Sequence, residues 1–132
     1  MSSFVNDPPP APPTAALRHF KNKLDVETDC WAVHEGLKAT ESDFVVIDVR
    51  GSAEFAQGHV PGAINIPYAA IPDAYLARYT KMPTFVVYGA GPHCNRADRA
   101  ALMLAALELP AKVMVGGFSG WREEGFEIDT GA

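Results

Sequence analysis

The sequence predicts a single α/β domain built around parallel strands, and two observations carry that prediction. The first is a set of short, continuous apolar runs, which are typical of strands covered on both faces. They lie at 44–48, 63–66, 84–88 and 112–115. The second is that segments of helical character separate these runs, at 52–56, 71–79 and 96–109. Strands that alternate with helices are joined by crossovers, so we expect these strands to be parallel neighbours.

Length and composition indicate a globular chain with one core. Its 132 residues are 48% apolar and 20% charged, as in ordinary soluble domains. The net charge of −5 argues against nucleic acid as a general partner, because phosphate binding needs a basic surface. No apolar run approaches the length of a membrane span, and the N-terminus has no signal-peptide pattern. We therefore expect a cytoplasmic protein without membrane contact, whose oligomeric state the sequence leaves open.

The N-terminus is rich in proline, with five of the chain's eleven prolines between positions 8 and 13. Proline disrupts helices and central strands, so residues 1–13 are expected to form a flexible tail ahead of a domain that spans 14–132. Thr14 is expected to cap a first helix that runs to Lys23. The apolar face of this helix would consist of Leu17, Phe20 and Leu24.

The two cysteines, Cys30 and Cys94, match no zinc-site spacing and form no Cys-x-x-Cys pair. We interpret them as free thiols in a reducing compartment. Cys30 stands beside a tryptophan at the start of a second expected helix, over 30–39, with Thr28 or Asp29 as its cap. This position favours core packing over chemistry. Neither a metal ion nor a cofactor is predicted.

The stretch from 84 to 99 contains the main candidate site. An apolar strand runs into a loop, and the loop runs directly into an apolar helix, for which Asn95 is the expected N-cap. Successive loop amides and the positive end of the helix can together hold an anion or a thiolate. The predicted anion-binding loop consists of Gly89, Ala90, Gly91, Pro92, His93 and Cys94.

Cys94 is the candidate nucleophile of this loop. It stands at the predicted helix N-terminus with Arg96 and Arg99 close by in sequence, and each of these features favours the thiolate. The alternative is a small, inward-facing and inert residue, and the sequence supports both alike. His93 is expected to face solvent. A phosphatase-type loop from Cys94 to Arg99 fits poorly, because it would consume the first turn of the helix.

Polar residues at other strand ends are expected to gather beside this loop. Asp48 and Arg50 follow one apolar run, and Gly116-Gly117 follows another. Ligands of open α/β sheets bind where the carboxyl ends of the strands meet. We interpret Asp48 and Arg50 as a structural ion pair and His59 as a hydrogen-bonded turn residue. Asp48, Arg50 and Arg96 would support the loop rather than react.

Together these features resemble the rhodanese family of sulfurtransferases, over residues 26–129. The motifs that carry the resemblance are Asp48-Val49-Arg50, Glu54-Phe55, the run Gly58-His59-Val60-Pro61-Gly62-Ala63-Ile64-Asn65-Ile66-Pro67, Gly116-Gly117-Phe118, Trp121 and Gly125-Phe126. The resemblance implies a mainly parallel five-stranded sheet flanked by helices. It also implies sulfur transfer through a persulfide on a loop cysteine, which is covalent catalysis by a thiolate. The expected partners are a small sulfur-containing anion and a thiol acceptor.

The chain departs from the family pattern at the first loop position. Active members carry the nucleophile directly after the strand, where this chain has Gly89. Relatives with a similar loop read Tyr-Cys-Ala-Gly-Pro-His-Cys-Asn, and this chain keeps only the second cysteine, Cys94. Two hypotheses follow: sulfur transfer through Cys94, or a catalytically silent module that binds an anion or a protein partner through residues 89–94. Because the first loop position lacks a thiol, the sequence narrowly favours weak or absent activity.

Overall fold

The computed structural model describes residues 3–132, which form a five-stranded, all-parallel sheet in the order β1-β5-β4-β2-β3. The strands are β1 (Glu27–Asp29), β2 (Phe44–Asp48), β3 (Ile64–Asn65), β4 (Thr84–Tyr88) and β5 (Ala111–Val115). The four strands expected from the apolar runs are parallel neighbours. The predicted α/β class is therefore confirmed.

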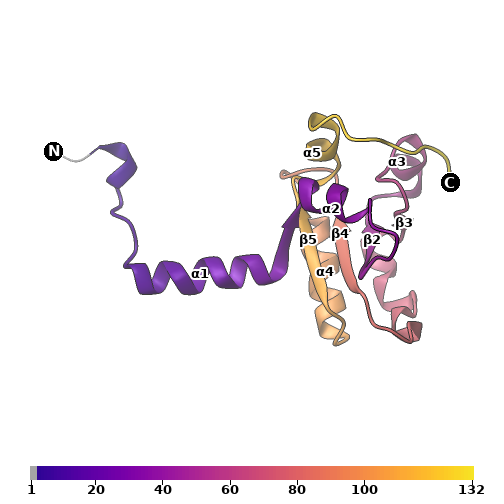
Figure 1. Ribbon diagram of the computed structural model, residues 1–132, viewed down its shortest axis with the longest axis horizontal. Coiled ribbons are helices and arrows are strands. Elements are labelled where there is room, and N and C mark those ends of the chain that lie inside the picture. The colour runs from indigo at the N-terminus through magenta and orange to yellow at the C-terminus, as the bar shows by residue number, and fades with distance from the viewer. Residues whose placement is uncertain (1–2) are drawn as a thin grey trace.

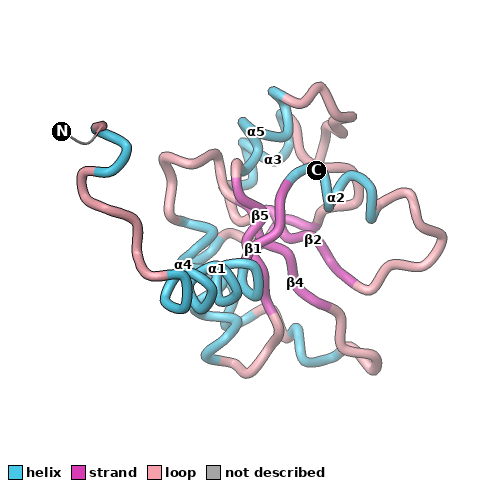
Figure 2. The backbone as a smooth tube through the Cα atoms, turned by 60° about the vertical axis from the view of Figure 1, so that its left-hand side comes forward, coloured by secondary structure: helices cyan, strands magenta, loops and turns pink. Residues whose placement is uncertain are grey.

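Helices cover both faces of this sheet (Figures 1 and 2). The α-helices are α1 (Pro13–Val26), α2 (Cys30–Gly36), α3 (Ser52–Gln57), α4 (Arg96–Ala106) and α5 (Gly117–Glu123), and the 3-10 helices are η1 (Phe4–Asn6), η2 (Tyr68–Asp73) and η3 (Leu76–Arg78). Side chains of α2, α3 and α5 share one apolar cluster with the sheet, and those of α4, η2 and η3 share the other. Successive strand residues point to opposite faces, so two covered faces explain why the strands are continuously apolar.

The edge strand β1 is absent from the four apolar runs. Its sequence, Glu-Thr-Asp, contains no apolar residue, yet it pairs in parallel with β5, placing Glu27 beside Val113 and Asp29 beside Val115. Asp29 also caps α2, because its Oδ1 accepts a hydrogen bond from the backbone N–H of Ala32 at 2.8 Å. Of the two caps considered for this helix, Asp29 is therefore the correct one.

Several predicted boundaries are wrong. The helix expected over 71–79 is two 3-10 helices instead, since Pro72 lacks a backbone N–H and Tyr75 has a left-handed φ of 50°. The helix expected over 96–109 ends at Ala106, and Glu108 follows with a φ of 61°. The helix expected over 30–39 is shorter and spans Cys30–Gly36. The strand expected over 63–66 is also shorter and spans Ile64–Asn65. Tight turns of the i to i−3 kind follow Gly36 and replace the last helical turn.

The first helix differs from its prediction in both extent and position. It begins at Pro13 and ends at Val26, and Thr14 does not cap it, because the N-cap position falls on Pro12. Figure 1 shows α1 projecting from the edge of the sheet, away from the rest of the molecule. None of its residues is buried. No helix within residues 3–132 combines the length and the apolar character needed to cross a bilayer.

Candidate functional site

The loop at 89–94 follows β4 and is held in place by α5. The carbonyl oxygen of Gly89 accepts a hydrogen bond from the N–H of Phe118, and that of Ala90 accepts one from Ser119, both at 2.9 Å. The carbonyl of Gly91 accepts from the N–H of Cys94 at 3.1 Å, which closes the loop into a tight turn. The first three loop carbonyls are thus occupied by the protein itself.

The loop amides are used differently from its carbonyls. Within residues 3–132, the N–H groups of Ala90, Gly91 and His93 donate to no backbone carbonyl. The first N–H groups of α4 are likewise free of intrahelical partners, as in any helix. These donors remain available to negative charge, and anion binding by this loop stays a prediction.

The double glycine after β5 allows the close approach of α5 to the loop. Gly116 and Gly117 have left-handed φ values of 91° and 59°. A Cβ atom on Gly117 would lie 2.7 Å from the carbonyl oxygen of Gly89 and 2.8 Å from the amide nitrogen of Gly91. No real side chain tolerates such distances from backbone atoms, so position 117 requires glycine both for its conformation and for space.

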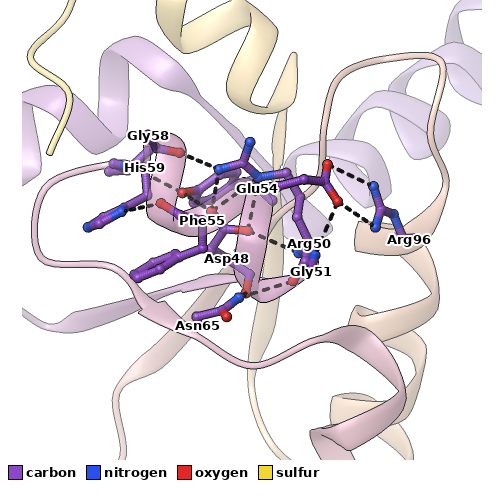
Figure 3. A network of polar contacts seen from close by, with 11 residues as sticks. Asp48, Arg50, Gly51, Glu54, Phe55, Gly58, His59, Asn65 and Arg96 are labelled. Carbon is purple, nitrogen blue, oxygen red and sulfur yellow. Dashed lines mark hydrogen bonds and ion pairs between the residues drawn. The ribbon is translucent and has the colours of Figure 1, made fainter. Parts of the chain in front are cut away.

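Cys94 is half-buried, and its sulfur accepts a hydrogen bond from Nε of Arg96 at 3.2 Å. This bond lowers the pKa of the Cys94 thiol, and the backbone N–H of Arg96, the guanidinium charge and the N–H of Ala90 lower it further, against a smaller opposing effect of burial. The guanidinium also contacts Glu54, with both Nη–Oε distances at 3.4 Å (Figure 3). Glu54 therefore positions the group that stabilises the thiolate.

The sulfur of Cys94 lies next to the first loop position. A Cβ atom on Gly89 would be in ordinary contact with its surroundings, 3.9 Å from Sγ of Cys94 and 3.6 Å from the amide nitrogen of Ala97. Gly89 does not have a left-handed φ, so its backbone also tolerates other residues. The volume that a side chain at position 89 would enter is thus already bordered by a sulfur atom and by the N-terminus of α4.

Open hollows border this loop, and two of them share lining residues. One of about 530 Å³ is lined by Cys94 and Arg96, and one of about 470 Å³ lies between the loop, α3 and α5. Ala90 and His93 line both of them. The larger hollow gives solvent and small molecules access to the Cys94 side of the loop.

A buried polar network supports the site from below (Figure 3). Asp48 is fully buried and accepts hydrogen bonds from the Arg50 guanidinium, the shortest at 2.7 Å. The Tyr88 hydroxyl donates to the same carboxylate at 2.6 Å, and burial raises the pKa of Tyr88 well above its usual range. Arg50 also donates to the carbonyl of Gly58 at 2.6 Å. The interpretation of Asp48 and Arg50 as a structural ion pair is confirmed.

Three smaller predictions are also settled by the structure. His59 donates from Nδ1 to the carbonyl of Phe55, at 2.8 Å, and stacks on the Phe55 ring, as expected for a turn residue. His93 is exposed. Asn95 occupies the N-cap position of α4, but the prediction that it caps the helix is wrong, because its side chain accepts from Nε of Arg99 instead.

The phosphatase-type loop is absent for the reason that the sequence suggests. Residues 96–99 already belong to α4, so Arg99 lies along the helix rather than closing a loop around Cys94. Cys30, by contrast, is buried in the apolar cluster beneath α2 and α5, and burial raises its pKa to about 11. Of the two thiols, only Cys94 has surroundings that favour ionisation.

Sequence analysis missed the role of Glu54 in this site. Its contact with Arg96 joins residues 42 positions apart, and no local pattern indicates such a pair. The hydrogen bond from Tyr88 to Asp48 was missed for the same reason, as it spans 40 positions. The Asp48 carboxylate and the Tyr88 hydroxyl meet because β2 and β4 pair in parallel, which places Asp48 beside Tyr88.

A sequence profile of the rhodanese-like domain matches residues 32–124. This chain belongs to the rhodanese-like domain family. A protein of Bacillus halodurans with a known crystal structure is 34% identical to this rhodanese-like domain and superposes with a TM-score of 0.84, over 90% of this chain and 87% of that one. A thiosulfate sulfurtransferase of Pseudomonas aeruginosa is 25% identical with a TM-score of 0.69, over 89% of this chain but only 21% of that one.

Among sequence relatives, an HTH-type transcriptional regulator of Mycobacterium tuberculosis is 36% identical over 68% of this rhodanese-like domain. The chain spans 39% of the length of that regulator and 64% of an uncharacterized Escherichia coli protein that is 28% identical. Because one relative is a transcriptional regulator, the expected lack of a nucleic-acid partner stays a prediction.

Proposed function

We propose that this domain is a sulfurtransferase in which Cys94 carries the sulfane sulfur. The observation that supports this most directly is the contact between Nε of Arg96 and Sγ of Cys94, at 3.2 Å. A depressed thiol pKa, a helix N-terminus and open access are the features that distinguish reactive cysteines from inert ones. The position of the sulfur beside Gly89 further favours Cys94 as a replacement for the family's usual nucleophile.

The reaction would proceed in two balanced steps. The Cys94 thiolate attacks the outer sulfur of thiosulfate, the sulfur–sulfur bond breaks, and sulfite leaves with the bonding electron pair. The resulting persulfide anion is then attacked at its terminal sulfur by cyanide or a thiolate, which takes that sulfur and returns Cys94 to the thiolate. In both steps negative charges approach one another, and Arg96 and the free loop amides would offset their repulsion.

Intact-mass measurement after incubation with thiosulfate tests this proposal. The chain should gain one sulfur atom, release sulfite, and lose the added sulfur when cyanide is supplied. Cys94→Ser should abolish the gain, whereas the matched control Cys30→Ser should keep it, because Cys30 is buried in the core. An unmodified parent chain, or equal modification of the Cys94→Ser variant, would contradict the assignment.

A second candidate function is a silent module that binds an anion through the 89–94 loop. It is favoured by Gly89, which has room for a side chain and no conformational need for glycine. On this hypothesis the parent is inactive, and Gly89→Cys in a Cys94→Ser background creates thiosulfate:cyanide transfer by placing a thiol at the first loop position. The parent and the Cys94→Ser variant should be measured in parallel. If the parent is active and Cys94→Ser abolishes that activity, the silent module is excluded.

A further inference from the structure

Within the described residues, the helix α1 meets the body only at its C-terminal end, where Lys112 donates to the carbonyl of Leu24. None of its fourteen residues is buried, and Leu17, Phe20 and Leu24 are 74%, 57% and 69% exposed. These three follow the i, i+3, i+7 spacing, so they form a single apolar stripe along the helix. Figure 1 shows the helix standing clear of the sheet.

A helix of this length needs a partner to be stable. Isolated helices shorter than about 15 residues are marginal in water, and most helical stability in proteins comes from packing of the apolar face. The ion pairs Lys21–Asp25 and Lys23–Glu27 lie within the helix and its exit, at 3.2 and 2.8 Å, and add little because they are exposed. The apolar stripe therefore indicates a contact that residues 3–132 of one copy do not provide.

The exposed area points in the same direction. The chain exposes 8625 Å², whereas a folded monomer of 14.2 kDa is expected to expose about 6,800 Å². The difference, about 1,800 Å², is shared between α1 and the exposed residues 3–12 that precede it. An interface of standard size takes roughly 800 Å² from each partner, so the area that α1 exposes is of the order that a dimer contact needs.

Charge indicates what the helix binds. In α1, Arg18, Lys21 and Lys23 outnumber Asp25, which gives +2, while residues 27–132 have eight Lys and Arg against fourteen Asp and Glu, which gives −6. With Asp7 these make up the net charge of −5. The helix and the remainder of the chain attract one another, whereas two such basic helices side by side would repel. A second copy of this chain supplies the acidic surface.

An exposed apolar surface on α4 fits the stripe. Leu102 is 72% exposed, and Ala105 and Ala106 lie on the same side of the helix, at i+3 and i+4. Small alanines let another helix approach closely, and the exposed carboxylates of Asp98 and Glu108 lie toward the two ends of this surface. Arg99 lies on the same side, three residues before Leu102, and its Nε donates to the neutral side chain of Asn95. With Asp98 and Glu108, the charge of this surface is therefore −1.

The root of α1 lies beside the start of α4 in the same chain. Lys23 and Glu27 line a hollow of about 220 Å³ together with Ala97 and Asp98. The apolar stripe of α1 and the outer surface of α4 therefore begin close together on each copy. A two-fold axis between two copies can then place each stripe on the α4 surface of the other copy. The Bacillus halodurans structure superposes on 90% of the chain, although residues 27–132 make up only 80% of it, so at least half of the first 26 residues have an equivalent there.

We propose that α1 is an exchange arm, which packs Leu17, Phe20 and Leu24 on the outer surface of α4 in a second copy of this chain while that copy's arm returns the contact. The resulting dimer is closed and two-fold symmetric. This dimer does not depend on whether Cys94 transfers sulfur. An experiment that disproves the dimer therefore leaves the proposed sulfur transfer untouched, and the reverse is also true.

Sedimentation equilibrium over a range of concentrations tests the arm. The parent should have twice the monomer mass, and Leu17→Glu and Leu102→Glu should each raise the dissociation constant at least about tenfold, because each places a charge in the contact from opposite sides. The matched controls are Asn22→Glu, which is exposed elsewhere on α1, and Tyr75→Glu, which is exposed on the body. Tyr75→Glu should leave the dissociation constant unchanged. Asn22→Glu should raise it far less than Leu17→Glu, because it only lowers the positive charge of α1. Added salt should weaken the dimer of the parent.

Three results would overturn the proposal. One is a parent that stays monomeric at about 1 mM, where even a weak contact would show. Another is a dimer that Leu17→Glu weakens and Leu102→Glu does not, which would mean that arm pairs with arm. The third is a dimer that the control Asn22→Glu weakens as much as Leu17→Glu does. Unchanged circular dichroism and Cys94 alkylation would show that each variant is folded.

Discussion

At the scale of single residues, the acidity of Cys94 depends mainly on one side chain. Arg96 contributes a hydrogen bond, a positive charge and a backbone N–H to the sulfur, and all three favour the thiolate. Glu54 contacts the same guanidinium from the other side and thereby limits its rotation. The lowered pKa is thus a property of a three-residue arrangement, which a lone cysteine at a helix terminus would only partly reproduce.

Replacing Arg96 should therefore slow the chemistry of Cys94 near neutral pH. Only the thiolate reacts with iodoacetamide, and the pKa of Cys94 is lowered in the parent, so its alkylation rate should reach half of its maximum below the pH typical of a free thiol. Arg96→Gln removes the hydrogen bond and the charge, which should move this midpoint to higher pH and reduce the rate at pH 7. The measurement is the rate of alkylation as a function of pH, with the alkylated protein detected by mass spectrometry.

Two comparisons make that experiment decisive. Arg99→Gln removes a neighbouring arginine that contacts Asn95 rather than the sulfur, so its pH profile should match that of the parent. Arg96→Lys keeps the charge without the guanidinium geometry and should fall between the two. A midpoint that Arg96→Gln leaves in place would show that the helix terminus alone determines the acidity.

At the scale of elements, one buried carboxylate joins β2, β4 and the turn before β3. Asp48 on β2 accepts from Arg50 and from Tyr88 on β4, and the Tyr88 hydroxyl in turn accepts from the N–H of Val60 at 3.1 Å. Arg50 extends the network to the carbonyl of Gly58 at the end of α3. This network fixes the strand ends from which the 89–94 loop begins.

Tyr88→Phe should destabilise the fold with little change in shape. The substitution leaves one oxygen of Asp48 and the N–H of Val60 without this partner in a buried place, which costs about 1–3 kcal/mol. Urea unfolding should show a lower midpoint with an unchanged m-value. Tyr75→Phe is the matched control, because Tyr75 is 72% exposed, and its midpoint should stay in place. Equal midpoints for both variants would contradict the structural role of the network.

At the scale of the whole molecule, the chain divides into a body and an arm. Both apolar clusters draw their members from residues between Cys30 and Phe126, and α1 contributes none. The edge strand β1 ties the arm to the sheet, and the side chain of Lys112 donates to the carbonyl of Leu24 at 3.0 Å. Local unfolding of α1 should therefore leave both apolar clusters of the body intact.

Limited trypsin digestion of dilute protein should cut the arm first. Arg18, Lys21 and Lys23 lie on an unburied helix, so cleavage there should precede cleavage in the body and leave a fragment that begins near Leu24. This fragment should persist and unfold cooperatively on heating, because it retains both clusters. Mass spectrometry over time provides the check, and early cleavage at Arg78 or Lys81 would argue against an independent body.

The sequence by itself determined the class of the fold and the place of the site. Continuous apolar runs separated by helical segments specify parallel strands, because only strands covered on both faces need to be apolar throughout. Local patterns alone also predicted the ion pair of Asp48 with Arg50, which the structure contains, and the loop over 89–94 between a strand and a helix N-terminus. That this loop binds an anion stays a prediction.

Only the tertiary structure decided how the parts meet. The polar strand β1 exists because β5 offers it an edge, which is a long-range effect that its three residues do not encode. The contact of Glu54 with Arg96 and the nearness of the Cys94 sulfur to Gly89 depend on how α3, α4 and β4 converge. The same holds for α1. The spacing of Leu17, Phe20 and Leu24 predicts an apolar helix face, but in the structure these side chains are exposed. Whether a side chain is buried depends on which elements pack against it, and the pattern within one helix does not specify those elements.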